Sequence, residues 1–222
     1  GINAALLPIG AEPIRLNAVA IPVRVNPSGP ERMIPAYSAA LIAAAERDKR
    51  IVALDGDLVL DTGLIPFRAR FRDRFLECGI AEQDMVSQAG GMALQGLIPV
   101  GHSFACFLAP RPAEQIYNNA SELTKVIYVG SLAGLLPGTP GHSHQAVNDI
   151  ALLGSIPGLE AVGPCCAAEV APLLNHLLSG TPGSGYLRLV SIPCDIPYAL
   201  PDNYRAVPGQ GVALRPGKDA LI

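Results

Sequence analysis

The segment Arg74–Phe104, "RFLECGIAEQDMVSQAGGMALQGLIPVGHSF", predicts a strand, a helix and a second strand in succession. Its first six residues read as a short strand, and the residues from Ala81 to Gly96 are typical of a helix that a glycine ends. The apolar run from Leu97 onward is typical of a second strand. Two strands joined by a helix pair in parallel, so this segment indicates an α/β fold.

The same alternation continues on both sides of this segment. Strands are predicted at residues 50–57, 74–79, 97–104, 125–131, 159–164 and 185–190, and helices at residues 36–48, 81–96, 112–123, 146–155 and 167–180. This order predicts a three-layer α/β/α domain with a mainly parallel sheet over residues 34–195. Residues 1–33 are expected to form an extended N-terminal arm, and residues 196–222 a linker toward a third domain that the sequence does not contain.

Composition narrows the classes of function. Of the 222 residues, 50% are hydrophobic and 16% are charged, which permits a sizeable core. The net charge of -3 gives no basic footprint, which argues against a nucleic-acid partner. No apolar run approaches the length of a membrane span, and the N-terminus lacks the order of a signal peptide. Five cysteines without a CxxC pair indicate free thiols, so we expect a cytoplasmic protein.

Polar and aromatic residues follow the predicted strands. Asp57, Glu82, the segment His102–Phe107 and the loop 131–145 each lie at or just beyond the end of a strand. Ligands of open parallel sheets bind outside the carboxyl ends of the strands, so these segments form the candidate site.

Each of these residues has a functional interpretation and a structural one. Glu82 is either a first-turn acid that favours the helix dipole or a partly buried acid with a raised pKa that passes a proton. Phe104 and Phe107 are either core residues or an aromatic wall for a flat heterocycle. Asp57, in "LDGDL", is either a turn residue or a ligand contact.

Three histidines lie on the same predicted edge: His102, His142 and His144. A zinc pair at His142 and His144 would need a cysteine or acid at ligand spacing, and none stands nearby, so no metal site is predicted. Proton transfer or hydrogen bonding to a hydroxylated substrate is the favoured interpretation.

Four segments in this order resemble the pyrimidine-binding domain of the transketolase family of thiamine diphosphate enzymes. They are "LDGDL", "GIAEQDMVSQAGGMALQG", "PVGHSFACFLAPRPAEQI" and "AGLLPGTPGHSHQAVNDIALL". The resemblance implies that Glu82 hydrogen-bonds the aminopyrimidine of thiamine diphosphate and promotes ylid formation for two-carbon ketol transfer. It also implies that Phe104 and Phe107 flank the pyrimidine, that Asp57 lies near the cofactor, and that His144 contacts substrate.

The chain lacks the family's diphosphate and magnesium signature, a GDG followed by Asn. A pyrophosphate-binding partner subunit is therefore expected to hold the diphosphate and Mg²⁺, with two copies of each chain in an α2β2-type assembly. The small residues Ala89, Gly90, Gly91 and Ala93 either let another subunit approach or pack on this chain's own sheet.

The chain also departs from the pattern of sugar-phosphate transketolases. Pro140, Ser191, Leu132 and Pro110 replace an acid, an arginine, a histidine and an aromatic residue of that pattern. Because a phosphate clamp needs cations, we expect a biosynthetic carboligation with an unphosphorylated substrate, which His102 and His142 would also contact. The alternatives are a 2-oxoacid dehydrogenase beta subunit, a deoxyxylulose-phosphate-synthase-like enzyme, and a non-catalytic stabilising subunit.

Overall fold

The computed structural model describes residues 32–135 and 140–196, together with residues 198, 200, 201, 204–207, 210, 212 and 213. Nearly all of the expected arm at residues 1–33 lies outside the described residues, and so does most of the expected linker at residues 196–222.

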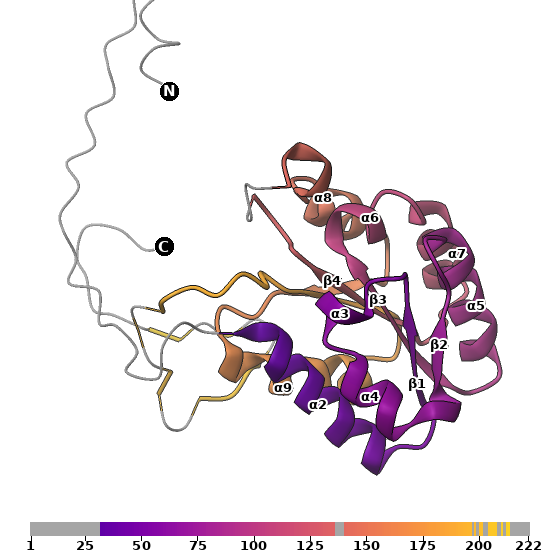
Figure 1. Cartoon of the computed structure of the whole chain (residues 1–222), viewed down its shortest axis with the longest axis horizontal. Helices are drawn as coiled ribbons and strands as arrows, with labels where there is room; N and C mark the ends of the chain where they lie inside the picture. Colours follow the sequence, from indigo (N-terminus) through magenta and orange to yellow (C-terminus); the bar gives the residue numbers. More distant parts are fainter. Residues whose placement is uncertain are drawn as a thin grey trace, which may run out of the picture.

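A parallel sheet of six strands forms the middle layer (Figure 1). The strands are β1 (Ile51–Asp55), β2 (Phe75–Glu77), β3 (Ile98–Phe104), β4 (Ile127–Ser131), β5 (Glu160–Val162) and β6 (Gly185–Arg188). They pair in the order β2-β1-β3-β4-β6-β5, and every pair is parallel. All six predicted strands are confirmed, as is the three-layer α/β/α architecture.

Helices cover both faces of the sheet (Figure 1). They are α2 (Met33–Arg47), α3 (Val59–Thr62), α4 (Ile65–Arg70), α5 (Glu82–Leu94), α6 (Ala105–Leu108), α7 (Ala113–Ser121), α8 (Asp149–Gly154) and α9 (Ala167–Asn175). One core cluster joins α2, α4 and α9 to the sheet, and a second joins α5, α6, α7 and α8 to its other face. The short helices α3, α4 and α6 were not predicted, because four to six residues hold too little periodicity to reveal a helix.

The strand β1 shows how the core is divided between the two faces. Ile51 and Ala53 belong to the cluster under α2, whereas Val52 and Leu54 belong to the cluster under α5. All five residues of β1 are buried, as expected for a parallel strand with helices on both faces.

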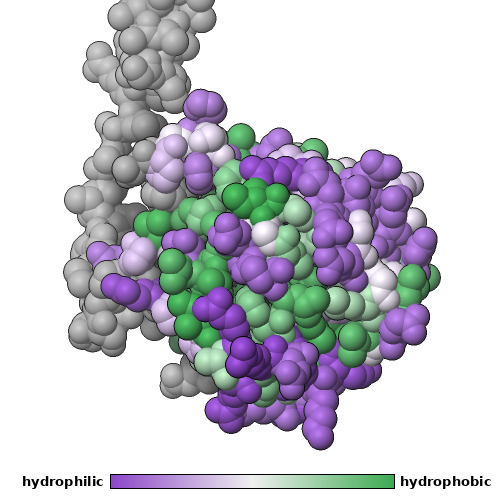
Figure 2. All heavy atoms as spheres, turned by 45° about the vertical axis from the view of Figure 1, so that its right-hand side comes forward, coloured by the Kyte–Doolittle hydropathy of each residue, from purple (hydrophilic) through white to green (hydrophobic). Residues whose placement is uncertain are grey.

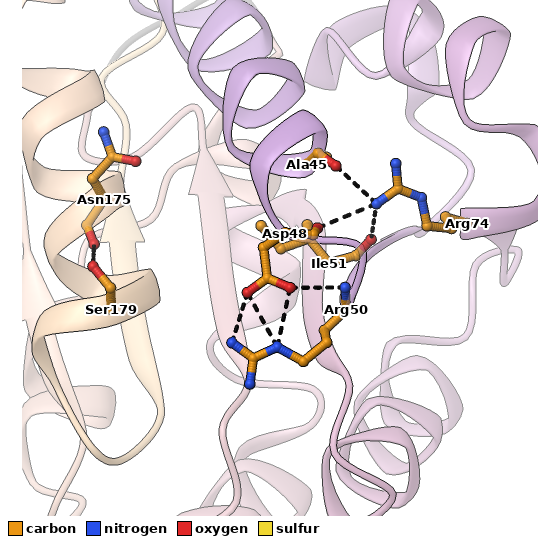
Figure 3. Close-up of polar contacts among 7 residues, drawn as sticks. All are labelled: Ala45, Asp48, Arg50, Ile51, Arg74, Asn175 and Ser179. Carbon is orange, nitrogen blue, oxygen red and sulfur yellow. Dashed lines mark hydrogen bonds and ion pairs between the residues drawn. The ribbon is translucent and has the colours of Figure 1, made fainter.

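At the amino edge of the sheet, Arg74 binds the turn between α2 and β1 (Figure 3). Nη1 of Arg74 donates hydrogen bonds to the carbonyl oxygens of Ala45, Asp48 and Ile51, at 3.0, 3.3 and 3.4 Å. The carbonyl groups at the end of α2 lack partners within the helix and carry partial negative charge. Arg74 therefore stabilises the turn from α2 into β1.

The strand order creates a switch point between β1 and β3. From β1 the chain moves outward to β2, and it then returns past β1 to build β3 and β4 on the other side. The segments that follow β1 and β3 consequently leave the sheet in opposite directions. Such a point opens a crevice at the carboxyl ends of the strands, where ligands of this type of sheet bind.

The small residues of α5 have different surroundings. A Cβ atom built on Gly90 would lie 2.1 Å from Oδ1 of Asn119 on α7, whereas one built on Gly91 would meet nothing within 4 Å. Ala89 is also buried. Ala89 and Gly90 thus pack within this chain, with Gly90 against α7 and not against the sheet, whereas Gly91 is exposed.

Apolar side chains also reach the surface. Figure 2 shows them gathered across the middle of one face, with hydrophilic side chains around and among them. Among the described residues, the large apolar side chains that are more than half exposed are Leu60, Ile80, Leu94, Tyr117, Leu123, Leu135, Val147 and Ile150. No helix among the described residues combines the length and the apolarity that crossing a membrane requires.

Candidate functional site

Glu82 is a buried acid at the start of α5, with 1% of its surface exposed. Nη1 of Arg111 donates to both carboxylate oxygens, at 2.8 and 2.9 Å, and the hydroxyl of Ser103 donates to Oε1 at 3.3 Å. A buried charge is tolerated only where partners of this kind compensate it. The carboxylate therefore faces the segment that follows β3.

An aromatic wall stands beside this carboxylate. The ring centroids of Phe104, at the end of β3, and Phe107, on α6, lie 5.9 Å apart. The Arg111 guanidinium lies over Phe107, with its carbon Cζ 4.0 Å from the ring centroid. The same arginine thus contacts both the acid and the wall, through a charged hydrogen bond and a cation–π contact.

His144 completes the wall from a different part of the chain. Its ring centroid lies 5.3 Å from that of Phe107 and 6.2 Å from that of Phe104, both edge-on. The loop is held in place by bonds from the Gly134 amide to the Ala146 carbonyl, at 3.1 Å, and from the Gln145 side chain to the Leu135 carbonyl, at 2.9 Å. Glu82, Phe104, Phe107 and His144 therefore meet at the carboxyl edge of the sheet, where the sequence places them.

Comparison with known proteins identifies the family of this chain. A family model described as "Transketolase, pyrimidine binding domain" matches residues 32–189. The chain belongs to the transketolase family through this pyrimidine-binding domain.

Three relatives are between 30% and 38% identical in sequence to this chain over the aligned residues. A transketolase family protein of Sinorhizobium fredii, y4mN, is 38% identical over 87% of the chain and 55% of its own length. The 1-deoxy-D-xylulose-5-phosphate synthase of Syntrophotalea carbinolica is 33% identical over 90% of the chain and 31% of its own length. A 6-deoxy-6-sulfo-D-fructose transketolase subunit of a Clostridium species, SqwH, is 30% identical over 84% of the chain and 57% of its own length.

A solved structure of a split-gene transketolase, an inactive beta4 tetramer, superposes with a TM-score of 0.73 and 32% identity. The match covers 86% of this chain and 61% of that one. The chain thus spans from about a third to somewhat over half of the length of the relatives it matches.

His102 does not lie where a substrate contact would need it. It is a β3 residue with 0% exposure, packed edge-on against the Tyr37 ring of α2 at 5.0 Å between centroids. Side chains alternate along a strand, so His102 faces α2 whereas its neighbour Ser103 faces Glu82. Burial lowers the pKa of His102 to about 3, so this imidazole is neutral near pH 7. The expectation that His102 contacts substrate therefore conflicts with its position.

Asp57 and His142 are exposed, and within the described part of the chain neither of them bonds to Glu82 or to the aromatic wall. Asp57 adopts a left-handed backbone, with φ of 64°, and its amide donates to Oε1 of Glu77 at 2.9 Å. The buried acid of this segment is Asp55, which accepts bonds from the Leu58 amide and the Thr62 hydroxyl, at 2.6 and 2.8 Å. Burial raises the pKa of Asp55 to about 6.

Two positions at which the chain departs from the sugar-phosphate pattern contact each other. The amide of Leu132 donates to the hydroxyl of Ser191 at 2.8 Å. On β6, the strand before Ser191, Nε of Arg188 and the Tyr186 hydroxyl each donate to Oδ2 of Asp149, at 2.8 Å. The Ser191 hydroxyl therefore accepts a hydrogen bond from the backbone, and Arg188 is already paired with Asp149.

Four residues that bond at or near this site had no predicted role of their own: Arg111, Ser103, Asp149 and Arg188. Arg111 lies inside the quoted segment "PVGHSFACFLAPRPAEQI", where it is the one Lys or Arg and precedes Glu114. A cation in an otherwise apolar stretch that follows a strand end could have identified it as the partner of a buried acid.

A surface cavity of about 510 Å³ lies at the opposite, amino edge of the sheet. Its polar lining is already paired: Arg50 binds Asp48 through two nitrogens, and the Lys125 ammonium donates to the carbonyl oxygens of Leu177 and Thr181 (Figure 3 shows the Arg50 pair). No group of three His, Cys, Asp or Glu side chains is placed to hold a metal within the described residues. The chemistry-bearing side chains thus gather at the carboxyl edge.

Proposed function

We propose that this chain is one subunit of a thiamine diphosphate-dependent, transketolase-like enzyme, in which Glu82 activates the cofactor's aminopyrimidine. The carrying observation is a buried carboxylate beside an aromatic wall: Glu82 is 1% exposed, and its partner Arg111 stacks on Phe107. The family match at residues 32–189 supports the cofactor.

The residues of this site fit an aminopyrimidine. That ring is flat and carries nitrogen atoms that donate and accept hydrogen bonds. The guanidinium of Arg111 is likewise flat and carries N–H donors, and it already fits between the Glu82 carboxylate and the Phe107 ring face. A planar group with N–H donors is thus compatible with this space.

Once bound, the cofactor would supply a carbon nucleophile that also serves as an electron sink. Glu82 would hold or release a proton at a pyrimidine nitrogen, because its carboxylate is buried and its partner Arg111 lies against the aromatic wall. Phe104 and Phe107 would exclude water from that proton and would hold the pyrimidine ring in a fixed orientation. His144, edge-on to both rings, would hydrogen-bond an oxygen of the substrate.

A partner chain would complete the site by holding the diphosphate and Mg²⁺, because this sequence contains no GDG motif. Five of the exposed apolar side chains support such a partner: Leu60, Ile80, Leu135, Val147 and Ile150, which all lie in segments that follow β1, β2 and β4. An exposed apolar rim around a site is typical of an interaction surface. We infer an α2β2-type assembly in the cytoplasm. The words "split gene" and "subunit" in the names of two relatives agree with it.

The substrate we propose is an unphosphorylated ketose or acceptor. Arg188 is paired with Asp149, and Ser191 replaces the arginine of the sugar-phosphate pattern. The named substrate of SqwH, 6-deoxy-6-sulfo-D-fructose, is also unphosphorylated. The second candidate is a deoxyxylulose-phosphate-synthase-like enzyme, which the relative from Syntrophotalea carbinolica favours.

Reconstitution with the pyrophosphate-domain chain tests these proposals. Glu82→Gln should lower turnover at least about 100-fold, the scale of general acid–base catalysis, whereas Glu114→Gln on α7 should not. Full activity of Glu82→Gln would instead support a stabilising subunit. Ordinary turnover of ribose 5-phosphate with xylulose 5-phosphate would refute the unphosphorylated substrate. Condensation of pyruvate with glyceraldehyde 3-phosphate would support the second candidate.

A further inference from the structure

We propose that Arg111 closes the Glu82 site of this chain by occupying the place of a flat, nitrogen-bearing ligand, and that its side chain must swing away before such a ligand binds. This inference rests on the proposed function, since it concerns how the same site is opened. The contact of Arg111 with Glu82 is thus autoinhibitory.

Arg111 uses both features that would recognise a planar ligand. Nη1 engages the two oxygens of Glu82, at 2.8 and 2.9 Å. The guanidinium lies over the Phe107 ring, with Cζ 4.0 Å from its centroid. A planar heterocycle with an amino group would seek the same carboxylate and the same ring face, so both cannot be bound at once.

Of the two members of the pair, Arg111 is the one that is free to move. Its side chain is 37% exposed, whereas that of Glu82 is 2% exposed. Glu82 is fixed further by the Ser103 hydroxyl, at 3.3 Å. Arg111 lies between Pro110 and Pro112, which restrict the backbone on both sides. The opening motion is therefore a rotation of the arginine side chain toward solvent.

The test is binding of 4-amino-2-methylpyrimidine to the full chain, measured by calorimetry without any partner. Arg111→Ala should bind this probe at least about 10-fold more tightly than wild type, a difference within the range of one buried charged hydrogen bond. Methylguanidine should compete with the probe in this variant, because it restores the missing group. Arg50→Ala removes an arginine–carboxylate pair at the other edge of the sheet and should bind as wild type does.

Equal affinity of wild type and Arg111→Ala would overturn the inference. If Arg111→Ala does not fold, the probe affinity of Arg111→Lys tests the inference instead. An ammonium keeps the charge beside Glu82 but lacks the plane that covers Phe107, so this variant should also gain affinity. Addition of Glu82→Gln to either variant should abolish the gain.

The two proposals fail in different ways. A gain in probe affinity together with full activity of the Glu82→Gln complex would sustain the closed site and refute the proposed function. No gain, together with an inactive Glu82→Gln complex, would do the reverse.

Discussion

Nη1 of Arg111 lies 2.8 and 2.9 Å from the two carboxylate oxygens of Glu82, a residue with 1% of its surface exposed. This contact joins the first turn of α5 to the segment between α6 and α7, so it ties together the segments that follow β2 and β3. The acid is held by the fold before any cofactor arrives. Its partner is the residue that a cofactor would have to displace.

The contact between α5 and α7 leads to the first prediction. Gly90→Ala should lower the free energy of unfolding by about 1–3 kcal/mol, because the new methyl group would lie 2.1 Å from Oδ1 of Asn119. Asn119 cannot easily give way, since its Nδ2 donates to the Val86 carbonyl and the Tyr128 hydroxyl, each at 3.0 Å. Urea unfolding measures the change.

Gly91→Ala is the matched control for this prediction. It lies on the same helix with open space around it, so alanine should raise the free energy of unfolding by roughly 0.5–1 kcal/mol through its helix propensity. Equal effects at the two positions would show that Asn119 does not restrict Gly90.

The acid at the start of α8 gives a second prediction. Asp149→Ala should lower the free energy of unfolding by about 3 kcal/mol, because it leaves the Arg188 guanidinium and the Tyr186 hydroxyl without their acceptor. Glu46→Ala breaks the exposed pair with Arg70 and should cost less than about 1 kcal/mol. Comparable losses in the two variants would contradict the view that burial sets the difference.

The architecture was predictable from sequence because each strand and long helix carries its own pattern. β1 is apolar on both faces, and the helix after Glu82 ends at a glycine. The convergence of Glu82, Phe104, Phe107 and His144 was predictable too, since each lies at or beyond the carboxyl end of a strand of one parallel sheet.

The side-chain partners were not predictable in the same way. His102 and Ser103 are neighbours in sequence, yet the pleat turns one toward Tyr37 and the other toward Glu82, and a one-residue difference in register exchanges them. The Arg111–Glu82 pair joins residues 29 apart in sequence. The local pattern could mark Arg111 as the partner of some buried acid, but which acid it meets depends on how the segment between α6 and α7 packs.

The buried histidine gives a prediction about pH. The folded state lowers the pKa of His102 from 6.5 to about 3, so below pH 6.5 the unfolded chain binds a proton that the folded chain does not. Stability is therefore lost as the pH falls, by about 2 kcal/mol between pH 6.5 and pH 5 for this group. His102→Phe should remove that loss, which urea unfolding at pH 7.5 and pH 5.0 would measure.

The titration of Asp55 changes stability in the opposite direction. The pH dependence of His102→Phe must therefore be compared with that of wild type. Its pKa is raised from 3.8 to about 6, so the folded state gains stability as the pH falls through this range. His142→Gln, at an exposed position, should keep the wild-type dependence. An identical pH dependence in His102→Phe and wild type would contradict the assignment to His102.

The apolar rim around the candidate site gives the last prediction. Ile80→Asp should weaken binding of the pyrophosphate-domain partner at least about 10-fold, because the 74% exposed side chain would become buried with a charge in the complex. Leu123→Asp is the control: its side chain is 76% exposed, but it follows α7 and precedes β4, at the amino edge of the sheet. Both variants should fold as wild type does, since neither side chain is part of the core. Co-purification and native mass spectrometry would measure the assembly, and loss of the partner in Leu123→Asp but not in Ile80→Asp would place the interface at the opposite edge from the one we propose.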